Sequence, residues 1–454
     1  MKKFAWVVLL IALGVYFLQD EALTPLAERA LNYQPAPVPA EQNAFVGIAG
    51  FNALAGRDFL QMGGAYIRNA HLGQANQQDE QNFDYREKEY SYSCAKELTE
   101  NCLNEIRADA KNIQKLQEAE QELIQRYLKI QEMPEYSNPI FPPSVYAVGN
   151  MVLPRFDYLT YISRILSAQA ILDIKNGRVS KGLNWFQKDM AFYRRVFAAK
   201  DADLIEKMIA LVQLRNHAML LSLLIEEGGL RALLAPLDAP KENMLNASWR
   251  EHATLLRAFY KTPLEALSVQ DPQSQKADFS TKFSAYFLYE LLYKRNMTAN
   301  FSAELLGNRQ NILNKTPIAL LSSEDISRKT LEQTGCTGIR MTLMNCKRLS
   351  NFIGEGLMLI DNGADAPAHY LLRAYDTDAL LRLVRARLEY QLAAKDSRAD
   401  PLKILAALPP ETFNPYTEKP FDFDAKRGAL VFQPAAKRDK DKRVEIRLFN
   451  PPQP

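Results

Sequence analysis

The sequence predicts a mainly α-helical fold, either an irregular multi-helix bundle or an array of helical hairpins, with a small antiparallel β-meander at its C-terminus. Apolar residues recur at intervals of three and four over much of the chain, and glycine-containing turns interrupt these stretches. After residue 410 the spacing of the apolar residues changes to two. We therefore expect helices up to residue 410 and strands beyond it.

The composition is that of a folded globular protein. The chain has 454 residues, 47% of them hydrophobic, and its 56 basic residues nearly balance 53 acidic ones. Such a chain is long enough for one large core or for several domains. It carries no excess charge of the kind that nucleic-acid binding requires. We expect neither a nucleic-acid partner nor a cofactor.

An apolar segment near the N-terminus predicts export and membrane anchoring. Lys2 and Lys3 precede an uncharged run from Phe4 to Leu18, and charge resumes at Asp20. No small-residue cleavage site follows the run, which favours a retained anchor over a cleaved signal peptide or a buried N-terminal helix. Because the lysines come first, we expect residues 1–19 to cross the bacterial inner membrane once, with the N-terminus in the cytoplasm and the body in the periplasm.

The four cysteines form two local pairs. Cys94 lies close to Cys102 in the sequence, and Cys336 lies close to Cys346. Nearby thiols pair in an oxidising compartment such as the periplasm, so we expect the disulfides Cys94–Cys102 and Cys336–Cys346. Four unpaired, mostly buried thiols are one alternative. A zinc site is another, although zinc ligands usually lie about two to four residues apart within each pair.

Residues 20–42 are expected to form a short membrane-proximal helix followed by a proline-rich spacer. Pro35, Pro37 and Pro39 exclude a helix and favour an extended segment, which would lift the body off the membrane. The next stretch, residues 43–64, contains five glycines. We expect it to pack as a compact, turn-rich segment.

The helical domain is expected to span residues 43–410. One long amphipathic helix is predicted over residues 97–133, and further helices over 156–176, 179–199, 202–228, 243–262, 283–306 and 376–395. A glycine turn between 156–176 and 179–199 predicts an antiparallel hairpin reminiscent of tetratricopeptide hairpins. Asp376 or Thr377 is expected to cap the last of these helices.

Residues 411–454 show the two-residue period of strands. The alternation covers three runs, at Phe421 and Phe423, at Leu430 and Phe432, and at Val444, Ile446 and Leu448. Turn signals separate the runs, so we expect a three-stranded meander. Its apolar face requires cover, which predicts that the meander docks on the helical body.

Motifs of the common enzyme classes are missing from the sequence. The four histidines are widely separated, and neither a His-Glu-x-x-His zinc helix, a nucleophile elbow nor a phosphate-binding loop is present. His217 lies in an apolar run, which indicates a core or interface histidine. The pairs Glu226–Glu227 and Asp361–Asp365 could act as acid and base, but such pairs arise by chance in helical proteins. We predict no catalytic or metal-binding residues and leave enzymatic activity open, with a non-enzyme favoured.

Residues 43–64, 294–306 and 413–432 resemble a group of uncharacterised membrane-anchored periplasmic proteins of Gram-negative bacteria. The resemblance implies a helical periplasmic protein with a small C-terminal strand unit, and it transfers no activity. We expect a single-pass inner-membrane protein whose helical domain is a binding or scaffolding component of the cell envelope, with another envelope protein as partner. The alternative is a membrane-anchored envelope hydrolase that uses acidic residues in a cleft of the helical domain.

Overall fold

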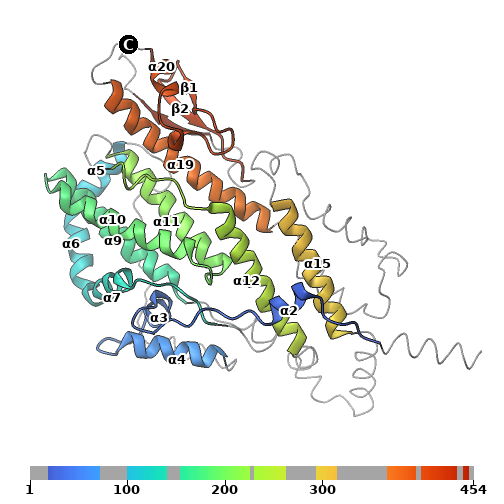
Figure 1. Ribbon diagram of the computed structural model, residues 1–454. Helices are drawn as coiled ribbons and strands as arrows, with labels where there is room; N and C mark the ends of the chain where they lie inside the picture. The colour runs from blue at the N-terminus through green and yellow to red at the C-terminus, as the bar shows by residue number, and fades with distance from the viewer. Residues whose placement is uncertain are drawn as a thin grey trace, which may run out of the picture.

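A computed structural model describes residues 19–71, 100–140, 154–224, 230–261, 293–313, 366–394, 400–436 and 443–448. Within these ranges the protein is mainly helical, with a small three-stranded antiparallel sheet near the C-terminus, which confirms the predicted fold class (Figure 1). The helices are α2 (Pro25–Leu31), α3 (Ala44–Ala49), α4 (Phe59–His71), α5 (Glu100–Ala108), α6 (Ala110–Ala119), α7 (Gln121–Glu132), α9 (Phe156–Lys175), α10 (Val179–Ala198), α11 (Leu204–Ser222), α12 (Pro240–Lys261), α15 (Arg295–Leu313), α19 (Ala366–Ala394) and α20 (Pro401–Ala406), and a short 3₁₀ turn spans Pro410–Thr412.

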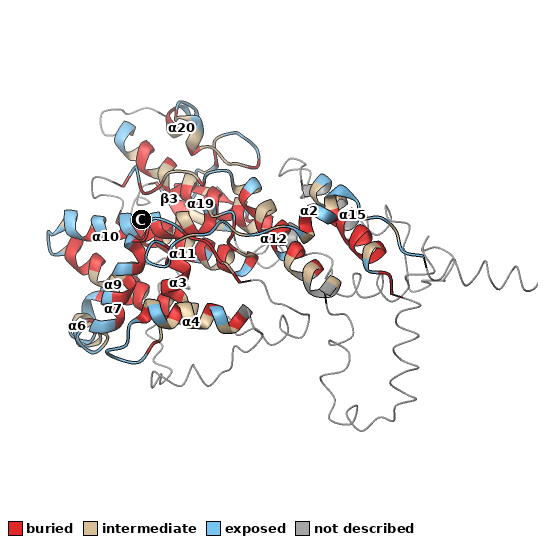
Figure 2. Cartoon of the chain, turned by 60° about the horizontal axis from the view of Figure 1, so that its bottom comes forward, coloured by how far each residue is buried: buried red, intermediate tan, exposed pale blue. Residues whose placement is uncertain are grey.

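Helices α9, α10 and α11 form the centre of the molecule, and their facing sides are buried (Figure 2). The turn between α9 and α10 contains Gly177, whose φ of +81° suits glycine. Gly182 then allows the two helices to approach closely, because a Cβ at this position would lie 2.4 Å from the carbonyl oxygen of Ala170. Both helices end within one residue of the predicted bounds. The turn between them is short, so the residues around it are enough to predict where one helix ends and the next begins.

Three short helices, α5, α6 and α7, replace the single helix predicted over residues 97–133. The chain turns at Asp109 and at Glu120, and all three helices pack against α9. An unbroken helix of that length would extend about 55 Å, whereas α9 is only about 30 Å long. The two breaks let the apolar positions Ile106, Ile113 and Tyr127 all reach the core, where each is fully buried.

The glycine-rich residues 43–64 contain helix rather than the predicted succession of turns. Helices α3 and α4 cross there at close range. A Cβ on Gly50 would lie 1.8 Å from the carbonyl oxygen of Phe59, and a Cβ on Gly63 would lie 1.9 Å from that of Val46. These two glycines are therefore required by backbone contact between helices. Local sequence does not distinguish this role from the commoner role of glycine in turns.

Replacing Gly63 by alanine should destabilise the protein by about 1 to 3 kcal/mol, because the new methyl group would overlap the backbone of α3. Gly64 provides a matched control in the same helix. A Cβ there would meet only the Arg68 guanidinium, at 3.5 Å, so Gly64→Ala should be neutral or stabilising by up to about 1 kcal/mol. Urea denaturation of the two variants measures the difference, and equal midpoints would contradict the close crossing.

Helix α19 begins at Ala366, ten residues before its predicted start at Asp376. Asp376 is therefore not the N-cap expected from the sequence, and neither is Thr377. The Asp376 carboxylate instead accepts hydrogen bonds from the Tyr416 hydroxyl at 2.8 Å and from the backbone N–H groups of Ala435 and Ala436 at 2.8 and 3.0 Å. An aspartate that resembles a local cap thus joins the middle of a helix to the C-terminal segment.

The C-terminal sheet consists of β1 (Asp422–Asp424), β2 (Ala429–Phe432) and β3 (Val444–Arg447), in the order β1-β2-β3. Phe423 pairs with Leu430, which in turn pairs with Ile446, so apolar residues stand opposite one another across the antiparallel strands. Strands β2 and β3 pack against α19. The buried side chains of Leu430 and Ile446 belong to the main core.

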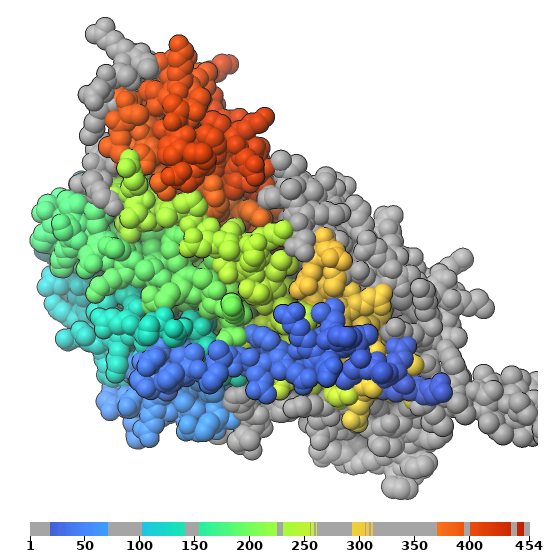
Figure 3. Space-filling model, viewed as in Figure 1, coloured from blue at the N-terminus to red at the C-terminus, as the bar shows by residue number. Residues whose placement is uncertain are grey.

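Residues 19–43 form a band across the surface of the body, which we call the strap (Figure 3). The proline-rich part is extended, as predicted, but it lies against the helices instead of standing off from them. The Tyr33 hydroxyl donates to Asp201 at 2.5 Å, and the backbone N–H of Ala36 donates to the same carboxylate at 3.1 Å. The Arg257 guanidinium donates to the carbonyl oxygen of Tyr33 at 2.8 Å.

A second, smaller core joins α2 of the strap to α12 and α15. Alanines make close packing possible here, since Ala27, Ala30, Ala253 and Ala299 are all fully buried. Within the described ranges, none of the helices is long and apolar enough to cross a membrane. The predicted anchor, residues 4–18, lies outside those ranges.

Candidate functional site

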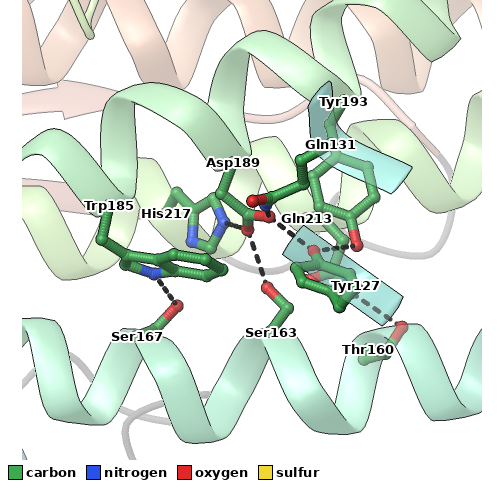
Figure 4. A network of polar contacts seen from close by, with 10 residues as sticks. All are labelled: Tyr127, Gln131, Thr160, Ser163, Ser167, Trp185, Asp189, Tyr193, Gln213 and His217. Carbon is green, nitrogen blue, oxygen red and sulfur yellow. Dashed lines mark hydrogen bonds and ion pairs between the residues drawn. The ribbon is translucent and has the colours of Figure 1, made fainter. Parts of the chain in front are cut away.

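A buried network of polar side chains from four helices is centred on Asp189 of α10 (Figure 4). One oxygen of its carboxylate, Oδ1, accepts hydrogen bonds from the hydroxyl of Tyr127 at 2.5 Å and from the side-chain amide of Gln131. Its other oxygen contacts Ser163 Oγ at 2.8 Å and His217 Nε2 at 2.5 Å. These partners come from α7, α9 and α11, so one carboxylate joins four helices.

The helices place these side chains by simple repeats. Tyr127 and Gln131 are four residues apart on α7, and Asp189 and Tyr193 are four residues apart on α10, so each pair shares one face of its helix. The hydroxyl of Tyr127 also lies 3.2 Å from that of Tyr193. We call Tyr127, Gln131, Ser163, Asp189, Tyr193 and His217 the Asp189 network.

Burial determines the ionisation of the tyrosines in this network. It raises the pKa of Tyr127 and of Tyr193 well above the usual value, and the negative charge of Asp189 adds to both increases. Both phenols therefore remain protonated, and Tyr127 can donate to the carboxylate. His217 presents Nε2 to Asp189, while its Nδ1 has no hydrogen-bond partner among the residues that the structure describes.

The Asp189 network contains a serine, a histidine and an aspartate, but not the geometry of a catalytic triad. A triad needs the histidine between the serine and the aspartate, so that it can remove the serine proton. Here Ser163 and His217 contact the same oxygen of Asp189. Asp189 and Ser163 are 0% exposed and His217 is 2% exposed, which leaves no access for a substrate. The arrangement fixes the relative positions of helices.

A second polar cluster lies at the N-terminus of α11. Asp203 caps this helix by accepting from the N–H of Glu206 at 3.0 Å, and Glu206 accepts in return from the N–H of Asp203 at 2.9 Å. The amide of Asn138 donates to the other oxygen of Glu206 at 2.7 Å. The ammonium of Lys207 donates to the carbonyl oxygens of Phe197 and Ala199, both at 2.6 Å, near the end of α10.

Burial shifts the ionisation of these groups in opposite directions. It raises the pKa of Glu206 to about 8, with a further increase from the charge of Asp203 and only partial opposition from Arg250. It lowers the pKa of Lys207 to about 7, against the effect of the nearby carboxylates. Perturbed carboxyls often mark functional sites. Here, however, the oxygens of Glu206 serve the capping box and Asn138, and Glu206 is 2% exposed.

The outward side of α11 is the third notable feature. We define the α11 outer face as the residues of this helix and its C-cap that are exposed or half-buried, namely Ile205, Met208, Ile209, Val212, Arg215, Asn216, Met219 and Leu223. Their spacing of three and four places them on one side of the helix, and the other residues of α11 are buried. Six of the eight are apolar, and Ile205 and Val212 are each 48% exposed.

The candidate residues named from the sequence are only partly within the described ranges. Cys94, Cys336, Cys346 and the pairs Glu226–Glu227 and Asp361–Asp365 lie outside them. Cys102 is fully buried in α5. His217 is a core residue, in agreement with its apolar sequence context. No group of three or more histidines, cysteines, aspartates and glutamates in the described part of the chain is placed to hold a metal ion.

Both buried polar clusters escape prediction from the sequence. Asp189 stands in an amphipathic helix and Glu206 in a largely apolar one, and their partners come from several other elements. The Asp203–Glu206 capping box was the one available local signal, since an aspartate three residues before a glutamate precedes an apolar run. Comparison of the chain with protein-family models, with curated proteins and with solved structures found no match.

Proposed function

We propose that the protein is a single-pass inner-membrane protein whose periplasmic helical body binds another protein of the cell envelope. The sequence supports the topology, because two lysines precede the apolar residues 4–18 and charged residues follow them. An oxidising location would allow Cys102, which is fully buried in α5, to form a disulfide. The partner that we propose for it is Cys94, and the proposed second disulfide joins Cys336 to Cys346.

The α11 outer face is the observation that carries the binding function. It is about 27 Å long, and apolar side chains dominate it from Ile205 to Leu223. Apolar residues scattered singly over a surface need no explanation, whereas several on one face of one helix are typical of a protein-binding site. Ile205 and Val212 are its exposed apolar residues, and Met208, Met219 and Leu223 beside them are half-buried against the main core.

A photo-crosslinking amino acid placed at Val212 should capture one discrete partner in intact cells. The same amino acid at Lys188, an exposed position on α10, is the matched control and should not capture that partner. In the Val212→Glu variant we expect the partner to be lost from a crosslink at Ile205, with an unchanged melting temperature, because position 212 is half exposed. Identical crosslinking patterns at 212 and 188 would contradict a binding role for this face.

A further inference from the structure

The first described residues of the chain are fastened directly to α15. The carboxylate of Asp20 accepts hydrogen bonds from the backbone N–H groups of Asn296 and Met297, each at 3.0 Å. These are the second and third residues of α15, whose N–H groups have no partner within the helix. Asp20 therefore caps a helix that begins 275 residues later in the chain, and its charge complements the positive end of the helix dipole.

Contacts continue along the next four residues of the strap. Asn296 donates from its side-chain amide to the carbonyl oxygen of Glu21 at 2.7 Å. Asn300 donates to the carbonyl oxygen of Ala22 at 2.8 Å and accepts from the N–H of Thr24 at 2.7 Å. Helix α2 follows at once and is buried against α12 and α15. The strap is thus held to the body from its first few residues onward.

This attachment leaves almost no free chain between the proposed anchor and the body. The anchor ends at Leu18, and Asp20 is only two residues further on. Two residues span at most about 7 Å, even when they are fully extended. The N-terminal turn of α15 must then lie within the headgroup region of the bilayer from which the chain emerges. Arg295, the first residue of α15, is exposed and can meet lipid phosphates.

We propose that the protein lies on its own membrane through the N-terminal end of α15, so that the body has a fixed orientation relative to the bilayer. The partner of this surface is the phospholipid headgroup layer. The inference rests on the retained anchor of the proposed function. It replaces the expectation that a proline-rich spacer lifts the body off the membrane, because that spacer belongs to the strap.

The test uses the full-length protein in vesicles of phosphatidylethanolamine and phosphatidylglycerol, some of which carry a quencher on the headgroup. A fluorescent amino acid is placed at Arg295, at Lys426 in the turn between β1 and β2, or at Lys115 on α6, all exposed positions. We expect quenching at position 295 to be at least three times stronger than at positions 426 and 115. Equal quenching at all three positions would overturn the inference.

A second variant, with ten glycine and serine residues inserted between Leu18 and Gln19, separates the tether from the body. Such a linker has an average span of about 17 Å, so quenching at position 295 should fall by at least half while the protein still floats with the vesicles. A protein that does not float at all would refute the anchor together with the orientation. A protein that floats without selective quenching at position 295 would refute the orientation alone.

Discussion

Replacing Asp189 by alanine is expected to destabilise the protein by about 3 to 5 kcal/mol. The change leaves Tyr127, Gln131, Ser163 and His217 without their shared acceptor. Removing one member of a buried charged group costs this much because the remaining polar groups have lost water and gained no new partner. The free energy of unfolding from urea denaturation measures the effect.

Asp157 on α9 supplies the control for this experiment. It also forms an ion pair, with Arg155 at 2.8 Å, but the two side chains are 47% and 38% exposed. Solvent screens such a pair, so Asp157→Ala should change the free energy of unfolding by less than about 1 kcal/mol. If the two alanine variants unfold at the same urea concentration, the Asp189 network does not hold the four helices in place.

Replacing Glu206 by glutamine should change how the stability of the protein depends on pH. Folding raises the pKa of this carboxyl from 4.5 to about 8, so the folded state binds a proton more tightly than the unfolded state. The contribution of the protonated wild-type side chain to the free energy of unfolding is fully present below pH 4.5 and is lost as the pH rises through about 8. Glutamine carries no proton to lose, so the variant should gain stability relative to the wild type across this range, by roughly 4 kcal/mol in total.

The quantity to measure is the difference in unfolding free energy between variant and wild type at several pH values from about 3.5 to 9, which bracket both pKa values of Glu206. The absolute stability of the wild type also includes Lys207, whose pKa falls from 10.5 to about 7 on folding. The contribution of Lys207 to stability depends on pH in the opposite direction. It is fully present above pH 10.5 and is lost as the pH falls through about 7. The charge of Glu206 also raises the pKa of Lys207, so the difference between variant and wild type removes only the part of this contribution that does not depend on Glu206.

Glu28→Gln is the control, because Glu28 is exposed on α2. Its difference from the wild type should stay within about 0.5 kcal/mol at every pH. A flat difference for Glu206→Gln would show that burial does not hold the proton on this carboxyl. The capping box at the start of α11 would then contain an ionised Glu206 carboxylate at neutral pH.

Local sequence signals succeeded where the structure depends on nearby residues. The hairpin of α9 and α10 and the three C-terminal strands follow from hydrophobic period and from turns a few residues long. The same signals failed where the neighbours are distant. Gly50 and Gly63 suggested turns but serve a helix crossing, and Asp376 suggested a cap but lies within α19. The single helix predicted over residues 97–133 is divided because its apolar face must follow α9.

The sequence by itself determined the class of fold, the positions of several helices and of the three strands, and the expectation of an exported, membrane-anchored chain, because these depend on local periodicity and on one apolar segment. Only the tertiary structure decided what the buried polar residues do. Asp189 meets partners 26 to 62 residues away, and Asp20 caps α15 by accepting from the N–H of Asn296, 276 residues along the chain. A buried polar group must find a partner wherever the fold supplies one, and no local pattern specifies that position.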